Sequence, residues 1–434
     1  MKRVHIIGIG GIGISALAQY YKAKGSRVTG SDASRSEITD DMVRRGIPVA
    51  IGHRTENVGK PDLVVHVAAL SRDNPELVRA RKLGIPVKSY PEVVGELTRE
   101  YDTVAVSGSH GKSTTTALIG LILVKAGLDP TIIVGTKLRE LGGTNFRMGK
   151  SRFLVLEADE WNKSFHYYHP KLAVLLNVDA EHLDIYKDYE GVIRGFARYV
   201  KNVWLDGVIV ANARDRGVKA ALRIANSKWH IAKTVWFNKK TPRYNLMIPG
   251  VHNQSNADAA WTAVKLLGVK KSVADAVFKS YNGAWRRLEK LTTNDRRHTT
   301  HAVVYSDYAH HPTEIKATLQ ALRERHSKGR IICVYEPHQE ERLTRLFKEF
   351  TTCFRGADKL VLLPIYRVLG REEKGGKKSL DLAHAIRQKE VFYAPSFIIA
   401  MNMLAADLMD KRTVIVFMGA GTIDAEARKF FSVR

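Results

Sequence analysis

The residues best placed to do chemistry follow an apolar, strand-like run that ends near residue 107. The sequence there reads Gly108-Ser109-His110-Gly111-Lys112-Ser113-Thr114 and leads into a helix expected over residues 114–124. A glycine turn between a strand and a helix directs backbone N–H groups at an anion, and the helix dipole favours negative charge there. Lys112 can reach terminal phosphates, and the Ser113 hydroxyl can hold Mg²⁺. The segment therefore predicts a nucleoside triphosphate site.

The spacing of this loop departs from the usual phosphate-binding pattern. Four residues usually separate its two glycines, whereas two residues separate Gly108 and Gly111. An ordinary strand–turn–helix with a chance lysine is the alternative. The Gly-Lys-Ser run directly after a strand and before a helix disfavours that alternative.

Two further expected strands, residues 152–156 and 172–176, end in polar clusters that contain Glu157 and His182. Ligands of parallel α/β sheets bind beyond the carboxyl ends of the strands, so one site is expected to collect Lys112, Ser113, Glu157 and His182. Carboxylate and hydroxyl oxygens suit Mg²⁺, although imidazole is not its commonest ligand. Ser113, Glu157 and His182 are therefore the predicted metal ligands. Helix caps and a surface histidine are the alternative for each residue taken alone.

A second glycine-rich turn lies near the N-terminus. Gly8, Gly10 and Gly13 match the G-x-G-x-x-G pattern, and Asp32 follows Gly13 by 19 residues at the end of an expected strand. Glycines in this order allow a nucleotide diphosphate to approach the backbone, and the acid can bind a ribose. Taken alone the pattern predicts NAD, but the same geometry serves any nucleotide diphosphate, so the ligand stays open at this point.

The rest of the chain, from about residue 250 onward, carries further candidates. Arg286-Arg287 could bind phosphate, and strands expected at 303–306 and 330–335 end in Asp307 and in a polar run that includes His338. The pair His310-His311 could suggest zinc, but no third and fourth ligand appears at metal spacing. Asn253 and Asn256 lie three residues apart on one face of an expected helix, where amides can bind a base edge or cap the helix.

Alternating strands and helices position all of these residues. The 434-residue chain is therefore predicted to be α/β with three domains: 1–99, Rossmann-like; 100–283, a central P-loop ATPase-type mononucleotide-binding sheet; and 284–434, Rossmann-like α/β. Cys333 and Cys353 are the only two cysteines, which fits a reducing compartment. No apolar run reaches the ~18 residues of a membrane span.

The composition narrows the class of partner. The dense glycines near the N-terminus argue against a signal peptide, so a cytoplasmic protein without membrane insertion is expected. The net charge of +25 is high, but its basic residues are spread along the chain. Basic stretches interleaved with aromatic residues are absent from the sequence, which disfavours nucleic acid. Polyanionic substrates, an anionic surface and a generally basic proteome remain open as explanations of the charge.

The motifs together resemble one family, the Mur ligases, which form amide bonds with ATP in peptidoglycan precursor synthesis. The resemblance covers nearly the whole chain and rests on motifs in family order: GIGGIGISALA, GSHGKSTTT, LEADE, NVDAEHLD, GVHNQSNADAA, RRLE, DYAHHPTEIKATL and GAGTI. The family's phosphate loop has the same shortened spacing. The sequence looks nearest to the branch that joins L-alanine to UDP-N-acetylmuramate; a ligase that recycles murein tripeptide onto UDP-N-acetylmuramate is the alternative.

The resemblance implies which residues bind which substrate. The first domain would hold the UDP-sugar and not NAD, the second ATP and Mg²⁺, and the third the amino acid. Substrate contacts in the first domain would come from Gly10, Gly11, Ile12, Gly13, Ser31 and Asp32. ATP would contact Gly108, Ser109, His110, Gly111, Lys112, Ser113, Thr114, Asn253 or Asn256, Arg287 and Asp307.

The implied reaction passes through an acyl phosphate, with alanine as the attacking amine and phosphate as the leaving group. Lys112 would neutralise the transferring phosphate, Ser113 would bind one Mg²⁺, and Glu157 and His182 would bind a second. Lys112, Glu157 and His182 are thus the implied catalytic residues. A monomer or homodimer is expected.

The implied amino-acid pocket contains one departure from the family pattern. Its residues would be Tyr308, His311, His338 and Arg342. Gln339 stands where the L-alanine branch typically has arginine, so a full charge for the alanine carboxylate is missing there. Arg342 remains, and the exact amino acid is the least determined part of the prediction.

Overall fold

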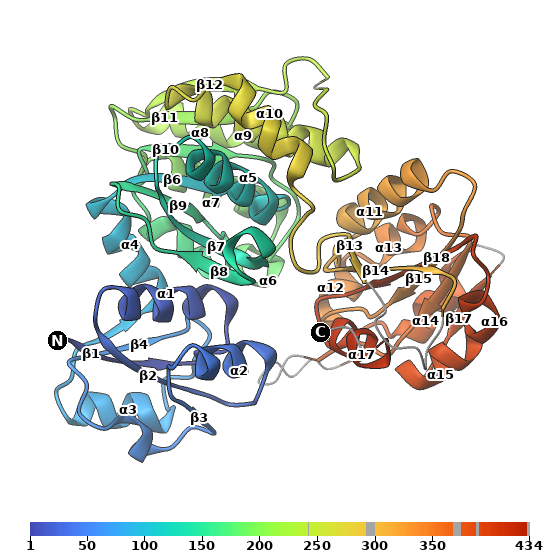
Figure 1. Ribbon diagram of the computed structural model, residues 1–434, viewed down its shortest axis with the longest axis horizontal. Helices are drawn as coiled ribbons and strands as arrows, with labels where there is room; N and C mark the ends of the chain where they lie inside the picture. Colours follow the sequence, from blue (N-terminus) through green and yellow to red (C-terminus); the bar gives the residue numbers. More distant parts are fainter. Residues whose placement is uncertain (242, 292–299, 368–374, 388–389, 432–434) are drawn as a thin grey trace. The chain divides into compact units, whose positions relative to one another are not determined.

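The computed structural model describes residues 1–434 apart from 242, 292–299, 368–374, 388–389 and 432–434. The described chain divides into two compact units, each shown in Figure 1. The first unit comprises Met1–Leu246 with Gln254–Tyr281 and carries two sheets. The second unit comprises Met247–Asn253 with Asn282–Arg434 and carries one sheet. The prediction of three α/β domains is confirmed by these three sheets and their helices.

The N-terminal sheet has five parallel strands in the order β3-β2-β1-β4-β5. The chain enters at the central strand and reverses its direction of progress between β1 and β4, which places a ligand-binding switch point beyond β1. Its elements are β1 (Arg3–Ile7), α1 (Ile12–Ala23), β2 (Arg27–Asp32), α2 (Glu37–Arg44), β3 (Val49–Ile51), the 3₁₀ turn η1 (Thr55–Val58), β4 (Leu63–His66), α3 (Pro75–Lys82), β5 (Val87–Ser89) and α4 (Tyr90–Glu100).

The second sheet has seven strands in the order β12-β11-β10-β6-β9-β7-β8. Strand β6 pairs in parallel with β10 and β9, so that Ser107 lies opposite Leu175 and Val106 opposite Glu157. The three polar segments that follow these strands therefore meet at one edge. The elements are β6 (Asp102–Ser107), α5 (Lys112–Lys125), β7 (Thr131–Leu138), η2 (Arg139–Leu141), β8 (Thr144–Arg147), β9 (Phe153–Glu157), η3 (Trp161–Tyr167), β10 (Leu172–Leu175), α6 (Leu183–Tyr186), α7 (Tyr189–Val200), β11 (Val208–Asn212), α8 (Arg216–Lys228), β12 (Lys233–Phe237), α9 (Val251–Leu266) and α10 (Lys271–Ser280).

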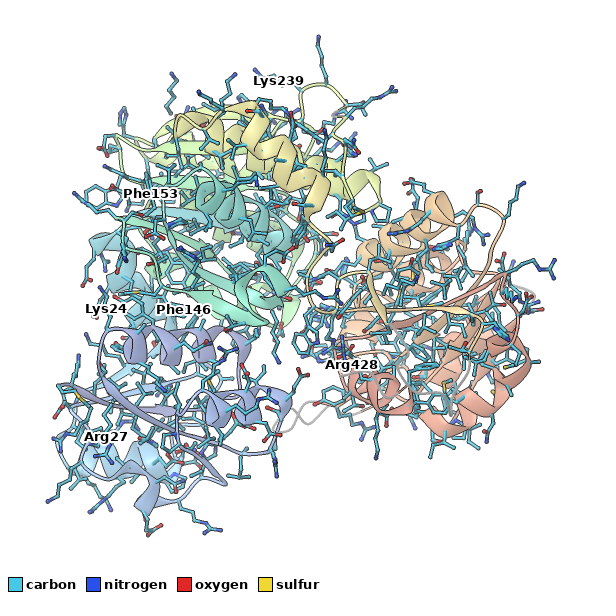
Figure 2. All side chains as sticks on the ribbon, viewed as in Figure 1. Lys24, Arg27, Phe146, Phe153, Lys239 and Arg428 are labelled. Atoms are coloured by element: carbon cyan, nitrogen blue, oxygen red, sulfur yellow. The ribbon has the colours of Figure 1, made fainter. Side chains whose placement is uncertain are left out.

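A hairpin at the edge of the second sheet corrects one expectation. The sequence of residues 139–150, with Gly142-Gly143 in it, predicts a less regular stretch, but β8 lies there and pairs antiparallel with β7. Strand β8 also packs on α1 of the first sheet: the ring of Phe146, labelled in Figure 2, lies edge-on to Tyr20 with centroids 6.4 Å apart. Asn145 accepts a hydrogen bond from Gln19 at 2.9 Å. The short strand is stabilised by this tertiary packing, which the local sequence does not show.

The third sheet has six strands in the order β13-β14-β18-β15-β16-β17, of which β13 is antiparallel to its neighbour. The carboxyl ends of β14 and β15 flank β18, since Asp307 and Tyr335 both lie opposite Met418. The elements are β13 (Glu289–Leu291), β14 (Val303–Asp307), α11 (Pro312–Arg325), β15 (Arg330–Tyr335), α12 (Glu340–Arg345), α13 (Phe347–Cys353), β16 (Lys359–Leu362), α14 (Ser379–Ala385), β17 (Val391–Tyr393), α15 (Phe397–Met403), α16 (Ala405–Leu408), β18 (Thr413–Met418) and α17 (Ile423–Phe430).

The cores explain which positions are apolar. Strands buried on both faces carry runs of consecutive apolar residues, as in β6, β10 and β18. Cys333 and Cys353 are both buried and unpaired. Among the helices of the described ranges, none is both long enough and apolar enough to cross a membrane.

Candidate active site

The phosphate loop lies between β6 and α5, at the carboxyl edge of the second sheet. Gly111 caps α5 with a φ of 84°, a left-handed conformation that glycine adopts readily. A Cβ at this position would lie 2.4 Å from Oδ1 of Asn256, so no larger residue fits without movement. Helix α5 begins at Lys112, two residues earlier than the sequence predicts. The N–H groups of its first turn are therefore available to an anion in the loop.

Asn177, which follows β10, supports the loop from the neighbouring strand. Its Oδ1 accepts from the His110 N–H at 2.8 Å, and its Nδ2 donates to the His110 carbonyl at 3.0 Å. Its backbone carbonyl accepts from the Ser109 N–H at 3.1 Å. Sequence reasoning did not single out this residue. An asparagine just past the strand beside the loop strand was the available signal.

Lys112 lies in the loop with its ammonium group already held by protein oxygens. Its Nζ donates to the Gly108 carbonyl at 2.7 Å and to Oε2 of Glu160 at 2.8 Å. Burial would lower the pKa of Lys112, but the charges of Glu160 and Asp159 outweigh burial and raise it. The side chain is therefore a fixed positive charge at the end of the loop.

Ser113 and Glu157 form a second contact at the same edge. The Ser113 hydroxyl donates to Oε2 of Glu157 at 3.2 Å, and the Gly135 N–H of β7 donates to Oε1 of the same carboxylate. Burial raises the pKa of Glu157, and the hydrogen bond from Gly135 and the charge of Lys112 only partly offset that rise. An additional positive charge nearby would therefore stabilise the ionised form of the Glu157 carboxylate.

His182 lies with two carboxylates that follow β9. One potential ligand atom from each of Asp159, Glu160 and His182 lies within 4.8 Å of the others. Nε2 of His182 is 3.9 Å from Oε1 of Glu160, whose side chain is 0% exposed. His182 has a left-handed backbone (φ 54°), which turns the chain into α6. The sequence predicts that His182 shares a metal ion with Glu157, but the carboxylates grouped with His182 in this structure are those of Glu160 and Asp159, which sequence reasoning did not select.

These residues fit a divalent cation of the magnesium type. Oε1 of Glu160 is buried and has no hydrogen-bond partner among the described residues. Burial raises the pKa of Glu160, with Lys112 acting against that rise. A buried carboxylate oxygen without a partner is costly, and a cation would satisfy it. The predicted ligands Ser113 and Glu157 lie in contact with each other, and His182 lies with Glu160 and Asp159.

The glycine turn of the first sheet lies beyond the ends of β1 and β2. The Gly10 N–H donates to Oδ2 of Asp32 at 2.8 Å, and the Ser31 carbonyl accepts from the Gly8 N–H at 2.8 Å. Gly11 precedes α1, which begins at Ile12. A Cβ on Gly13 would lie 3.0 Å from the Tyr90 hydroxyl. All six predicted substrate residues of this domain lie in the turn, at the start of α1 or at the end of β2: Gly10, Gly11, Ile12, Gly13, Ser31 and Asp32.

In the second unit, Asp307 ends β14 and is almost fully buried. It accepts hydrogen bonds from the N–H groups of Leu288 at 2.6 Å and Ala309 at 2.8 Å. Burial raises the pKa of Asp307, and the charge of Arg287 opposes that rise. The guanidinium of Arg287 lies 5.3 Å from the centre of the Tyr308 ring. Tyr308, Arg287 and Asp307 are therefore close together.

The predicted amino-acid residues lie at the ends of β14 and β15. His338 stacks on Tyr366 with ring centroids 5.6 Å apart, and its Nδ1 lies 3.2 Å from a guanidinium nitrogen of Arg342. His311 is buried and caps α11. Gln339, between His338 and α12, has a φ of 69°, which is unusual for a residue other than glycine. Such backbone strain is frequent at functional sites.

The two asparagines of α9 lie in different settings. Nδ2 of Asn253 donates to the Pro249 carbonyl at 2.6 Å, one turn earlier. Asn256 lies against Gly111 of the phosphate loop. Both are nearly fully buried. Asn256 is thus placed at the loop, and Asn253 stabilises the start of its own helix.

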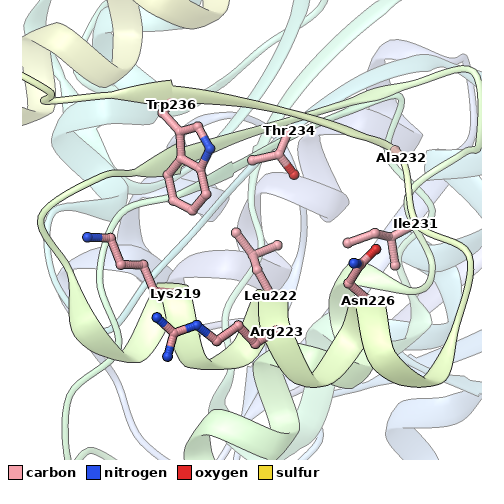
Figure 3. Close-up of a pocket in the computed structure, with 8 residues that line it drawn as sticks. All are labelled: Lys219, Leu222, Arg223, Asn226, Ile231, Ala232, Thr234 and Trp236. Carbon is pink, nitrogen blue, oxygen red and sulfur yellow. The ribbon is translucent and has the colours of Figure 1, made fainter.

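A separate hollow of about 470 Å³ lies between α8 and β12 (Figure 3). Its lining includes Lys219, Arg223 and Trp236, with the apolar Leu222 and Ile231. None of the motif residues above contributes to it, and its lining side chains include no carboxylate. The hollow is therefore separate from the phosphate-loop site.

Comparison with known proteins agrees with the three sheets. The family described as Mur ligase family, catalytic domain, matches residues 3–102; the Mur ligase middle domain matches 106–264; and the Mur ligase, glutamate ligase domain, matches 286–421. The UDP-N-acetylmuramate–L-alanine ligase of Acetivibrio thermocellus is 38% identical over 97% of this chain and 94% of its own length.

Solved structures show the same architecture. The UDP-N-acetylmuramate–alanine ligase of Thermotoga maritima has a TM-score of 0.79 and 25% identity, covering 100% of this chain and 99% of that one. A murein peptide ligase of Psychrobacter arcticus shares the fold, with a TM-score of 0.71 and 21% identity over 100% and 98% of the two chains. On these matches and the geometry above, the chain belongs to the Mur ligase family.

Proposed function

We propose that this protein is a UDP-N-acetylmuramate–L-alanine ligase, which uses ATP to form the amide bond through an acyl phosphate in cytoplasmic peptidoglycan precursor synthesis. The observation that carries the proposal is the grouping of Lys112, Glu160 and His182 beyond the phosphate loop, in the same compact unit as the nucleotide-sugar turn. Full-length similarity to ligases of this name supports the choice of reaction.

The three sheets divide the work. Residues 1–99 bind UDP-N-acetylmuramate, residues 100–283 bind ATP with Mg²⁺, and residues 284–434 bind L-alanine and part of ATP. The glycine turn beyond β1 offers N–H groups to the diphosphate. No residue needs to become covalently attached to the substrate, so positioning and charge neutralisation supply most of the catalysis.

Lys112 neutralises charge on the γ-phosphoryl group of ATP while the substrate carboxylate attacks it and ADP leaves. The contact with Glu160 fixes the ammonium before the substrates arrive, which avoids reorganisation during the reaction. The alanine amine then attacks the acyl phosphate, and phosphate leaves. His338 and Arg342, in contact in this structure, bind the alanine carboxylate.

Magnesium would be held by two groups of residues. Ser113 and Glu157 would take one ion, and His182 with Glu160 and Asp159 a second. Bound there, the ions would neutralise phosphate oxygens and the acyl phosphate. The unsatisfied Oε1 of Glu160 supports this assignment.

The alternative is a ligase that adds murein tripeptide to UDP-N-acetylmuramate. Gln339 supports this alternative, because the position lacks the positive charge that the alanine branch typically has there. The chemistry at the phosphate loop would be the same. Only the amine substrate would differ.

A coupled assay of ADP release tests both candidates. Purified protein is given ATP, Mg²⁺ and UDP-N-acetylmuramate, with each single amino acid or with murein tripeptide. We expect ADP release to require L-alanine. Release with tripeptide and with no amino acid would assign the recycling reaction instead, and no release with any amine would refute both.

A further inference from the structure

The buried carboxylate of Glu76 lies against the first sheet, in contact with Ser31 behind the nucleotide-sugar turn, and is not part of any motif considered above. Glu76, in the first turn of α3, is 0% exposed and its oxygens accept hydrogen bonds from four side chains. The donors and distances are His5 Nε2 at 2.7 Å, Ser31 Oγ at 2.8 Å, His53 Nδ1 at 2.9 Å and Asn57 Nδ2 at 3.1 Å. Glu76 thereby joins β1, β2, η1 and the segment after β3.

The carboxylate is charged at neutral pH. Burial alone would raise its pKa, but the hydrogen bonds from His5, His53, Ser31 and Asn57 outweigh burial and hold the pKa of Glu76 at about 2. A carboxylate only accepts hydrogen bonds. Nδ1 of His53 must therefore carry a proton, and in the neutral ring Nε2 is left as an acceptor.

His53 stands at the carboxyl edge of the first sheet, one strand outward from Asp32. It follows Gly52, whose N–H donates to the Asp32 carbonyl at 2.8 Å. Strands β3 and β2 pair directly up to Ile51 and Asp32. The His53 side chain is 18% exposed, and Nε2 has no hydrogen-bond partner among the residues described. In this fold the acid ending β2 binds the ribose, so the base lies farther along this edge.

We propose that Glu76 and His53 select the base of the nucleotide sugar. Glu76 acts as a positioning residue that keeps the proton on Nδ1 of His53, and Nε2 then accepts a hydrogen bond from the N3–H of uracil. Cytosine presents a lone pair at N3, which would face the lone pair of Nε2. The inference rests on the proposed function, since it concerns the UDP-N-acetylmuramate site.

Calorimetric binding of UDP and CDP to the full chain tests this role. We expect the wild type to bind UDP at least about tenfold more tightly than CDP, because cytosine cannot donate the N3–H hydrogen bond to Nε2 of His53. His53→Phe should remove most of that difference by weakening UDP. Glu76→Gln should also reduce it, because the new amide can donate to Nδ1 and let the proton move to Nε2.

The ratio of the two affinities separates this role from a merely structural one. Asp62→Asn, which changes a carboxylate to an amide in the exposed Arg3 pair of the same sheet, should leave the ratio unchanged. His53→Phe lies at a partly exposed site and keeps the test decisive if Glu76→Gln does not fold. An unchanged ratio in His53→Phe, or equal binding of UDP and CDP by the wild type, would overturn the inference. ADP release with UDP-N-acetylmuramate and L-alanine in those cases would leave the proposed function standing.

Discussion

Glu160 lies between two motif residues, with Oε2 at 2.8 Å from Nζ of Lys112 and Oε1 at 3.9 Å from Nε2 of His182. The contact links the phosphate loop after β6 to the polar segment after β10 through a carboxylate that follows β9. Three adjacent strands thus deliver one positive and two potential metal-binding groups to one edge. Changes at Lys112 and at Glu160 should therefore affect phosphoryl transfer and Mg²⁺ binding, respectively.

Lys112→Ala should remove the charge that neutralises the transferring phosphoryl group. We expect kcat for ADP release to fall by about 10³-fold, the scale seen when a preorganised charge-stabilising group is removed. UDP-N-acetylmuramate should still bind, because its site lies beyond β1 and β2. Lys125→Ala, at the exposed C-terminal end of the same helix, is the matched control. Turnover retained in Lys112→Ala would remove this lysine from the mechanism.

Glu160→Gln should weaken Mg²⁺ binding, so that the reaction requires a higher Mg²⁺ concentration. We expect the Mg²⁺ concentration for half-maximal rate to rise at least about tenfold, because an amide oxygen is a weaker ligand than a carboxylate. The measurement is ADP release against Mg²⁺ concentration. If the variant shows the wild-type Mg²⁺ curve, Glu160 is not a ligand.

The same site predicts a pH dependence of metal binding. Burial raises the pKa values of Glu157 and Glu160 above their ordinary value of 4.5, so both take up protons at a higher pH than exposed carboxylates do. Because the protonated forms do not bind cations, the apparent affinity for Mg²⁺ should fall as the pH is lowered through these raised pKa values. In Glu160→Gln this pH dependence should be shallower; an identical dependence would contradict the assignment.

The sequence could predict the parts of the site that depend on backbone pattern. Glycines, strand ends and Gly-Lys-Ser located the phosphate loop, because turn geometry and helix polarity are local properties. The choice between Glu157 and Glu160 as the partner of His182 could not be made, because both acids stand at the end of the same strand and only the tertiary structure brings Glu160 to His182. Strand β8 was missed for a similar reason, since packing on α1 stabilises it.

Gln339→Arg should improve binding of the amino acid. The new guanidinium would add a charged partner for the alanine carboxylate beside His338 and Arg342, which lie 3.2 Å apart. We expect the KM for L-alanine to fall about tenfold, the scale of one charge-assisted hydrogen bond. Gln339→Lys is a useful comparison, because lysine adds the charge without the planar fork. An unchanged alanine KM in Gln339→Arg would show that this position does not contact the amino acid.

The buried Glu76 predicts a specific loss of stability in acid. Its pKa in the folded state is about 2, below the ordinary 4.5, so it stabilises the fold fully above about pH 4.5 and loses that contribution as the pH falls from about 4.5 toward 2. Urea unfolding followed by circular dichroism should therefore show a steeper fall of the unfolding midpoint between about pH 5 and 3 in the wild type than in Glu76→Gln. Because salt screens exposed pairs such as Arg3–Asp62 more than buried ones, the difference should persist at high ionic strength. Parallel curves for the two proteins would mean that Glu76 keeps its ordinary pKa.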